Sequence, residues 1–376
     1  MKKITLLLLT LLLALTGGHA AQFLFVGTYT DGKPDKGIYV YEFHPASGAL
    51  TLVSTAQNIV NPSFLSLTRD GKFLYACTET QTPQAGSVTA FAFDNQTRLL
   101  TEIGKQPTGG DNPAYITVDS LSRFVITANY TGGSLSVLPL RKDGRPEAVS
   151  QLISFSGKSM IQGRQDQSHP HSAVFSPGGA YLFCPDLGTD QIHIFSFDPE
   201  KPQPLTSFGQ SSLRVRSGEG PRHFVFHPDH RYAYCINELG GSITTYRYHE
   251  GFLYSNQRMP AYAEPRDTYS GADIHLSPDG RFLYASNRGE NTIAIFYVNA
   301  SNRRLTLMGH RSTLGDHPRN FTLDPSGNFL LVANQNSHNI VVFRRDPLSG
   351  DITPTGTQIS VPRPSCLVFG TYEPTQ

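Results

Sequence analysis

The feature that most constrains this chain is a unit of about fifty residues that occurs six times with constant internal spacing. Each copy opens with Pro or Gly, continues as an alternating apolar segment, and passes through a short polar turn into a second apolar segment. The openers and the residues thirteen positions later are Pro62 and Tyr75, Pro113 and Ile126, Pro170 and Phe183, Pro221 and Tyr234, Gly271 and Tyr284, and Pro318 and Leu331. A repeat of this length predicts four-stranded blades of a β-propeller, which must pack in a ring to bury their faces.

The two chain ends supply the parts of one more blade. Residues 364–369 have the pattern of an inner strand with no second strand after it, whereas residues 23–27, 37–41 and 50–53 supply three further strands. Joining them removes free strand edges and closes the ring. We therefore predict an all-β, seven-bladed propeller of four-stranded blades, closed by N- and C-terminal strands that share one blade. The chain has no Trp and so lacks the WD motif; a pair of β-sandwiches is the alternative, but it requires no fixed repeat.

The N-terminus is typical of a cleavable signal peptide. Lys2 and Lys3 precede an apolar run from Leu6 to Leu15. This run is shorter than the about 20 residues that a membrane-spanning helix needs. We expect cleavage after Ala20, which leaves residues 21–376 as one propeller domain, periplasmic or secreted and without membrane attachment. An uncleaved membrane anchor is the alternative.

Composition narrows the class of partner. The chain has 31 Lys and Arg against 30 Asp and Glu, so it has no excess of basic residues for binding nucleic acid. We expect a small molecule as the partner, while the oligomeric state stays open. The four cysteines lie in or beside predicted strands, and we expect buried thiols, without disulfides, at Cys77, Cys184, Cys235 and Cys366.

Two positions of the repeat carry chemistry, because equivalent residues of all blades meet near the axis. The first directly follows the opener and comprises Ser63, Ala114, His171, Arg222, Ala272, Arg319 and Ser365. The second ends the second strand and comprises Tyr29, Glu79, Tyr130, Leu187, Glu238, Arg288 and Gln335. The residues just before this second column are mostly Asn or other short polar residues, which indicates a structural role.

We expect the large polar members of these columns to converge at one mouth of the channel, namely His171, Arg222, Glu238, Arg288 and Arg319. Buried charges are costly unless they pair or bind a ligand, so three Arg and one Glu indicate a site for a carboxylate or phosphate. A ring of ion pairs between blades is the structural alternative.

Two further features lie near this mouth. His169 and His171, with Asp273 and His275, resemble metal ligands, but their spacing matches no known site, and we predict neither metal nor cofactor. Residues 157–168 lengthen the connection before His169 and should overhang the mouth, either as a lid or as an ordinary surface loop.

Several motifs resemble the propeller-type 6-phosphogluconolactonases and the related 3-carboxy-cis,cis-muconate cyclases over essentially the whole mature chain. They are Phe25-Val-Gly-Thr-Tyr-Thr, His169-Pro-His-Ser, Gly220-Pro-Arg-His-Phe-Val-Phe-His-Pro, Tyr234-Cys-Ile-Asn-Glu-Leu, Asp273-Ile-His-Leu-Ser-Pro-Asp-Gly and Ser286-Asn-Arg-Gly. The resemblance implies an active-site group of His, Arg, Glu and Arg, matched here by the catalytic candidates His171, Arg222, Glu238 and Arg288. Arg319, from its column, and the flanking His169 and His223 are candidate substrate-binding residues.

We therefore predict metal-independent hydrolysis of a sugar lactone, as in a 6-phosphogluconolactonase. The sequence contains no G-x-S-x-G, so an acyl-serine route has no support. Arginines would hold the anionic group and stabilise the oxyanion, and His171 or Glu238 would activate water. A carboxymuconate cycloisomerase and a non-catalytic, extracellular ligand-binding propeller are the alternatives. Because 6-phosphogluconolactone is intracellular, export leaves open which lactone is hydrolysed and whether a phosphate is required.

Overall fold

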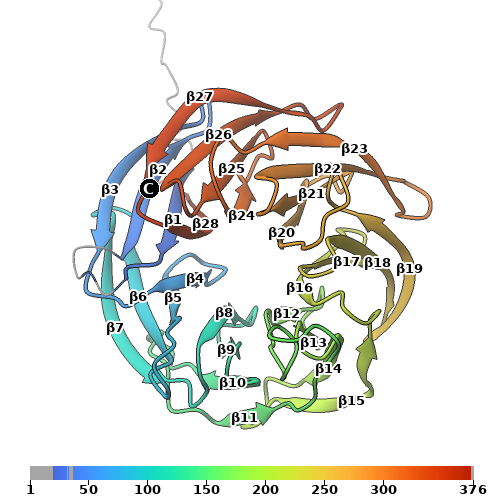
Figure 1. Cartoon of the computed structure of the whole chain (residues 1–376). Coiled ribbons are helices and arrows are strands. Elements are labelled where there is room, and N and C mark those ends of the chain that lie inside the picture. Colours follow the sequence, from blue (N-terminus) through green and yellow to red (C-terminus); the bar gives the residue numbers. More distant parts are fainter. Residues whose placement is uncertain (1–19, 32, 34–36, 374–376) are drawn as a thin grey trace, which may run out of the picture.

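The computed structural model describes residues 20–31, 33 and 37–373, which form a ring of seven four-stranded antiparallel sheets (Figure 1). Every regular element in these residues is a strand, so the predicted fold class is confirmed. No helix in the described part of the chain is long and apolar enough to cross a membrane. The first nineteen residues of the predicted signal peptide lie outside the described residues, and the cleavage after Ala20 stays a prediction.

Each blade runs from an inner strand at the axis to an outer strand at the rim (Figure 1). Blades 1 to 3 consist of β28 (Pro364–Tyr372), β1 (Ala21–Thr28), β2 (Ile38–His44) and β3 (Ala49–Ala56); β4 (Pro62–Leu67), β5 (Phe73–Thr78), β6 (Ser87–Asp94) and β7 (Leu99–Pro107); and β8 (Pro113–Val118), β9 (Phe124–Asn129), β10 (Ser134–Pro139) and β11 (Gln151–Ser154). Blades 4 and 5 consist of β12 (Val174–Phe175), β13 (Tyr181–Asp186), β14 (Gln191–Phe197) and β15 (Leu205–Arg214); and β16 (Pro221–Phe226), β17 (Tyr232–Asn237), β18 (Ser242–His249) and β19 (Phe252–Pro260). Blades 6 and 7 consist of β20 (Gly271–Leu276), β21 (Phe282–Asn287), β22 (Thr292–Val298) and β23 (Leu305–Ser312); and β24 (Pro318–Leu323), β25 (Phe329–Asn334), β26 (Asn339–Arg345) and β27 (Ile352–Ser360).

Blade 1 closes the ring, as predicted. Its second strand, β1, pairs antiparallel with the C-terminal strand β28 on one side and with β2 on the other. Phe25 faces Val368 across the first pairing and Val40 across the second. The two ends of the chain therefore share one sheet, and that sheet has no unpaired edge at the junction.

The hydrophobic core lies between neighbouring blades. Phe25 of blade 1 is fully buried and meets Phe93 of blade 2 edge to face, with the ring centroids 4.9 Å apart. Burying such a side chain contributes about 1.5–3 kcal/mol, and aromatic contacts of this geometry add to that. The cysteines Cys77, Cys184, Cys235 and Cys366 are all buried free thiols, which confirms the expectation drawn from their strand positions.

A β-bulge at the start of the inner strands brings the first column to the mouth of the channel. In blade 5, Pro221 pairs with Asn237 and His223 pairs with Ile236, so Arg222 is left unpaired. In blade 7 the pairing passes from Pro318 to Asn320 and leaves out Arg319 in the same way. Such an extra residue bends the strand and redirects its side chain. The side chains of consecutive residues in one strand can therefore lie at different depths of the channel.

The short polar residues before the second column fasten the strand ends. Asn237 is fully buried and its Nδ2 donates hydrogen bonds to the hydroxyls of Ser242 and Thr244 at 2.9 and 3.0 Å. Asn129 makes the equivalent bonds to Ser134 and Ser136 in blade 3. These contacts agree with the structural role expected for this column.

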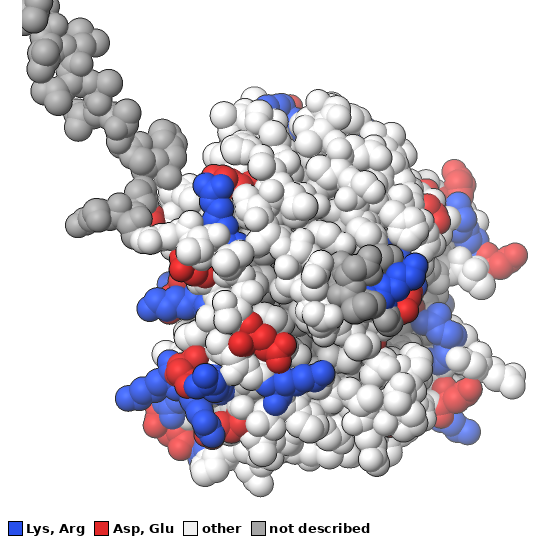
Figure 2. Space-filling model, turned by 90° about the vertical axis from the view of Figure 1, so that its left-hand side faces the viewer, with Lys and Arg blue, Asp and Glu red and all other residues white. Residues whose placement is uncertain are grey.

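The outer surface is mixed in charge. Figure 2 views the ring from its side, where Lys and Arg lie among Asp and Glu and do not form a patch of one sign. This matches the near-equal numbers of basic and acidic residues in the sequence. The absence of a nucleic-acid partner stays a prediction.

Candidate active site

The two columns meet around an open pocket of about 490 Å³ at one mouth of the channel, which we call the upper pocket. It is lined by Glu79, Gln81, Asn112, Ala114, Tyr130, Arg164, His171, Glu238, Arg288 and Arg319. Four of the predicted residues are therefore together: His171, Glu238, Arg288 and Arg319. In blade 3 the small side chain of Ala114 holds the repeat position that Arg222 holds in blade 5, and it leaves space for the pocket.

Glu238 is the centre of a cluster of guanidinium groups. Its Oε1 lies 2.5 Å from Nη2 of Arg164, and its Oε2 lies 2.7 Å from Nη2 of Arg288. Nε of Arg222 is 2.9 Å from the same Oε2, although its N–H is not aligned for a hydrogen bond. Burial alone would raise the pKa of Glu238, but Arg288 and Arg222 outweigh it and hold that pKa well below its usual range. This carboxylate stays ionised and fixes three cations.

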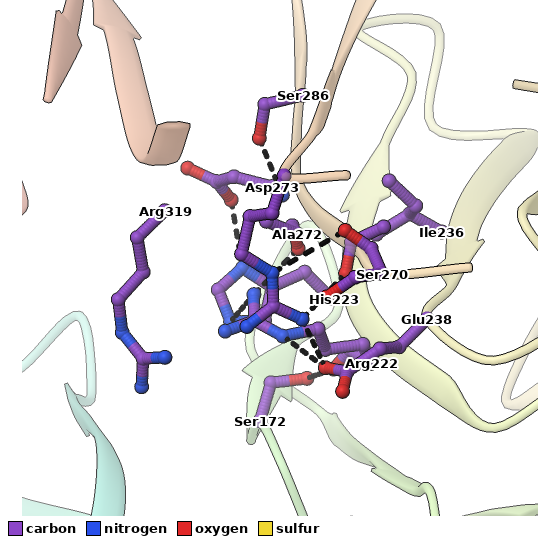
Figure 3. Close-up of polar contacts among 12 residues, drawn as sticks. Ser172, Arg222, His223, Ile236, Glu238, Ser270, Ala272, Asp273, Ser286 and Arg319 are labelled. Atoms are coloured by element: carbon purple, nitrogen blue, oxygen red, sulfur yellow. Dashed lines mark hydrogen bonds and ion pairs between the residues drawn. The ribbon is translucent and has the colours of Figure 1, made fainter. Parts of the chain in front are cut away.

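Arg222 lies beneath the upper pocket and is not among its lining residues. Its side chain is only 2% exposed, and its Nη1 donates a hydrogen bond to the carbonyl of Ala272 at 2.5 Å (Figure 3). Burial, with a further effect of Arg288, lowers the pKa of Arg222 to about 9, so the group remains a cation at neutral pH. The contacts of Arg222 with Ala272 and Glu238 help to fix the Glu238 carboxylate in position.

His171 stands at the edge of the pocket as a neutral imidazole. Burial and the nearby charge of Arg222 hold the pKa of His171 well below its usual range. Its Nδ1 is buried without a hydrogen-bond partner in the described part of the chain. A buried polar atom without a partner is costly, and such atoms are common where a ligand or ordered water completes the site.

Arg319 faces the pocket from the side opposite Glu238. Its side chain is 16% exposed, and its guanidinium donates no hydrogen bond among the described residues (Figure 3). It lies 3.6 Å from Oε2 of Glu79 and over the ring of Tyr29, at 5.2 Å from the centroid. Several N–H groups of a nearly buried cation are therefore available to a bound oxygen anion.

Arg164 comes from the insertion 157–168, which overhangs the mouth as expected. The loop is fastened to blade 4, because Gln165 is fully buried and its Nε2 donates to the carbonyl of Leu187 at 2.8 Å. Ser159 donates a hydrogen bond to Oδ2 of Asp190 at 2.5 Å, in the same turn of blade 4. The insertion is thus a built wall of the pocket, with Arg164 directed inward and 43% exposed.

His223 and His169 do not line the upper pocket. His223 lies on the far side of Arg222, where Nη1 of Arg222 donates to its Nε2 at 3.2 Å. Because Nε2 accepts, Nδ1 of His223 carries the proton and donates to Oδ1 of Asp273 at 2.7 Å. The ring of His169 stacks on the ring of Tyr130, with the centroids 4.4 Å apart. Nδ1 of His169 lies 2.8 Å from the carbonyl oxygen of Tyr130. Substrate binding by these two histidines stays a prediction.

Asp273 organises what we call the lower network: His223, Asp273, His275 and Asn320. Its Oδ2 lies 2.9 Å from Nε2 of His275 and accepts a hydrogen bond from Nδ2 of Asn320. Burial would raise the pKa of Asp273, but His275 and His223 outweigh it and keep that pKa well below its usual range. The network borders a second pocket of about 620 Å³ farther along the channel.

The metal arrangement considered from the sequence is not assembled. His169 and His171 contact Tyr130, whereas Asp273 and His275 belong to the lower network. Among the described residues, no group of three or more His, Cys, Asp or Glu side chains is placed to hold a metal ion.

Sequence reasoning missed two charged residues of the pocket. Glu79 stands in the second column, but its blade carries no Arg in the first column to draw attention to it. Arg164 has no equivalent in other blades, because it belongs to an insertion. The column pattern could have identified Glu79, whereas only the position of the insertion pointed toward Arg164.

Comparison with known proteins decides the family. The family model described as lactonase, seven-bladed β-propeller, matches residues 23–369. The chain belongs to this family. Across this lactonase family, a Formosa agariphila protein named 6-phosphogluconolactonase is 44% identical over 93% of this chain and 99% of its own length. A Bacillus subtilis protein of the same name is 34% identical over 92% of this chain and 97% of its own.

Solved structures agree with this assignment. A periplasmic gluconolactonase from Pseudomonas aeruginosa superposes with a TM-score of 0.88 and 35% identity, covering 94% of this chain and 100% of that one. A Bacteroides fragilis protein, provisionally named 6-phosphogluconolactonase, gives a TM-score of 0.89 and 39% identity over 94% of this chain and 99% of its own. Both the family resemblance and the fold predicted from the sequence are thereby confirmed.

Proposed function

We propose that the upper pocket hydrolyses the ring ester of a small sugar lactone. The observation that carries this proposal is the guanidinium of Arg319, nearly buried, without a hydrogen bond and directed into a pocket whose other cations are fixed on Glu238. Preorganised donors of this kind stabilise the negative charge that forms on the carbonyl oxygen when water attacks an ester. The lactonase relatives support the same reaction class.

The contacts of each residue indicate its role in the proposed reaction. Arg319 and Arg288 bind the carbonyl oxygen or an anionic substituent of the lactone and stabilise the oxyanion. Glu238 holds Arg288, Arg222 and Arg164 in place, which is a positioning role for a carboxylate already engaged by three cations. Water must lose a proton as its oxygen attacks the carbonyl carbon, so the pocket must also supply a base.

The reaction proposed here uses no metal ion. The lining of the upper pocket contains Arg164, Arg288 and Arg319 against two carboxylates, with Arg222 directly beneath. This excess of fixed positive charge opposes a divalent cation and favours an anionic substrate or transition state. The arginines supply the stabilisation of the oxyanion that a Lewis acid provides elsewhere.

The substrate class follows from the relatives and from the charge of the site. The relatives are named for phosphorylated and unphosphorylated gluconolactones, and the solved gluconolactonase is periplasmic. We propose export of this chain to the periplasm, with cleavage after Ala20, and action there on a gluconolactone-type ring. Net positive charge in the pocket suits both an anionic substituent and the oxyanion.

Hydrolysis by the mature chain, residues 21–376, tests the proposal. Phosphorylated and unphosphorylated gluconolactones and a carboxymuconolactone are assayed by proton release, with and without a chelator. We expect turnover of a gluconolactone that the chelator leaves unchanged. Arg288→Ala should lower kcat by about 10²–10³-fold, as loss of an oxyanion donor does. Arg304→Ala, at an exposed arginine distant from the upper pocket, is the matched control and should leave kcat unchanged.

Binding of lactones without turnover would instead support the non-catalytic propeller. Activity confined to the muconolactone would support the cycloisomerase, and loss of activity with the chelator would contradict the metal-independent route. Each result rejects a different part of the proposal.

A further inference from the structure

We propose that Glu79 is the general base that activates the hydrolytic water in the upper pocket, an assignment that rests on the lactonase function proposed above. Glu79 directly follows β5 in blade 2 and stands in the second repeat column, but it is not among the residues that the sequence predicts to converge at the mouth.

The two carboxylates of the pocket differ in how far their oxygens are engaged. Both oxygens of Glu238 contact guanidinium groups at 2.5 to 2.9 Å. Oε2 of Glu79 accepts a hydrogen bond from the Tyr29 hydroxyl at 2.7 Å and lies 3.6 Å from Nη2 of Arg319. Among the described residues, no hydrogen bond or ion pair reaches Oε1 of Glu79. This oxygen is available to accept a proton from water.

Glu79 is held in place from both its backbone and its side chain. Its N–H donates to the carbonyl of Asn61 at 3.1 Å, and Nδ2 of Asn61 donates to the Glu79 carbonyl at 2.9 Å. Tyr29 then orients the carboxylate, and burial raises the pKa of Tyr29, so this phenol remains a donor. A base fixed in this way loses little entropy when it meets the water.

The position of Glu79 beside Arg319 suits the two partners of the reaction. Arg319 offers unengaged donors for the carbonyl oxygen, and Glu79 offers an unengaged acceptor for the water on the same side of the pocket. A water bound to Glu79 therefore stands next to a carbonyl bound to Arg319. A carbonyl carbon bound between Arg319 and Glu79 would be within reach of both the donor and the acceptor, as hydrolysis requires.

The other two candidate bases are less suited. Glu238 would have to gain a proton while three guanidiniums stabilise its charge, and its pKa is held well below the usual range. His171 is buried beside Arg222, and these two effects hold its pKa well below the usual range. A general base works best when its affinity for a proton matches the working pH.

Glu79 takes a proton from water while the water oxygen bonds to the lactone carbonyl carbon, and the carbonyl electrons move to its oxygen beside Arg319. The intermediate collapses, the bond from the carbonyl carbon to the ring oxygen breaks, and the protonated Glu79 returns its proton to that ring oxygen. The product is the open-chain hydroxy acid, which releases one proton to solution.

Comparison of Glu79→Gln with wild type tests the assignment on the lactone that wild type hydrolyses fastest. We expect kcat to fall by about 10²–10⁴-fold while KM changes only a few-fold, because the amide keeps the shape but accepts no proton. The residual kcat should then rise about tenfold per pH unit between pH 6 and 8, since hydroxide must replace the base. Glu79→Asp should recover part of the loss. Glu102→Gln, on the exposed strand β7, is the matched control and should behave as wild type.

The outcomes separate the two proposals. If wild type hydrolyses a lactone and Glu79→Gln keeps its kcat or its pH profile, Glu79 is not the base, although the lactonase function stands. A wild type that hydrolyses no lactone overturns both. If Glu79→Gln does not melt cooperatively, Glu79→Asp and Tyr29→Phe replace it, and unchanged kcat in both rejects the assignment.

Discussion

The upper pocket and the lower network lie in the same channel on opposite sides of Arg222, yet their polar groups differ in whether they have hydrogen-bond partners. Below Arg222, Asp273 and its neighbours satisfy one another through short contacts. In the upper pocket, the Arg319 guanidinium and Nδ1 of His171 have no hydrogen-bond partner among the described residues. Buried polar groups that pair internally stabilise a fold, whereas groups left open indicate where a ligand completes the structure.

The largest effect on the fold should come from the lower network. Asp273→Ala removes the acceptor shared by His223, His275 and Asn320, so their donors lose a buried partner. Breaking such a buried cluster costs about 3–5 kcal/mol in the free energy of unfolding. Urea unfolding measures this loss of free energy of unfolding. Asp267→Ala, at a residue on an exposed loop, is the control. A loss below about 1 kcal/mol would mean that the lower network does not stabilise the fold.

Arg319→Met should affect activity strongly and stability little. The guanidinium makes one long ion pair, lies over the Tyr29 ring and donates no hydrogen bond, so an apolar chain of similar length costs about 1–2 kcal/mol of stability. Loss of an oxyanion donor should lower kcat/KM by about 10²–10³-fold, or roughly 2.7–4 kcal/mol. Lactone kinetics and thermal melting of the same preparation check both parts. A large drop in Tm with little loss of activity would reverse the proposed distinction.

Acidification should destabilise the fold through its buried neutral histidines, of which His223 belongs to the lower network. Burial and the charge of Arg222 lower the pKa of His223 from 6.5 to about 4, so between these values the unfolded chain binds more protons than the folded one. Stability therefore falls as the pH decreases from 6.5 to 4, by roughly 3 kcal/mol for a shift of this size. Below that window, Asp273 and Glu238 lose the stabilisation that their lowered pKa values provide above pH 4 to 4.5.

Urea midpoints measured between pH 7 and pH 4 give this dependence. His249→Gln, at an exposed histidine, should leave this dependence unchanged, whereas His223→Gln should reduce its slope above pH 4 by the contribution of His223 and leave that of His171. A midpoint that is constant between pH 6.5 and 4 would contradict the burial of His223 as a neutral group.

The smallest effect is expected for Arg164→Ala. This residue is 43% exposed, so solvent screens its pairing with Glu238 and the expected loss of stability is below about 1 kcal/mol. Since Glu238 keeps two other cations, kcat/KM should fall only about fivefold, equivalent to about 1 kcal/mol. Steady-state kinetics on phosphorylated and unphosphorylated lactones measure this fall in kcat/KM. A loss of 10²-fold or more would place Arg164 in direct contact with the reacting atoms.

Much of the fold was predictable because the repeat itself fixes it. The spacing of thirteen residues gave the blades, and the complementary fragments at the ends gave their number and the shared blade. The columns brought His171, Glu238, Arg288 and Arg319 together for the same reason: equivalent positions of a ring meet at its axis.

The depth at which each side chain lies along the channel was not predictable from the repeat. The bulge in β16 turns Arg222 and His223 toward different layers, and strand alternation does not encode that displacement. The contact of Arg164 with Glu238 joins residues 74 positions apart, through a loop that no other blade repeats. Such contacts depend on the conformation of one loop, for which a periodic pattern contains no information.

The shared blade has a consequence for when the site comes into being during synthesis. Glu79 belongs to blade 2 and Arg319 to blade 7, and these blades flank blade 1, whose inner strand β28 is the last strand of the chain. Until β28 docks beside β1, nothing fixes the two walls of the pocket at their mutual distance. A nascent chain that lacks its final strand therefore contains the residues of the site but does not hold them in the arrangement of the pocket.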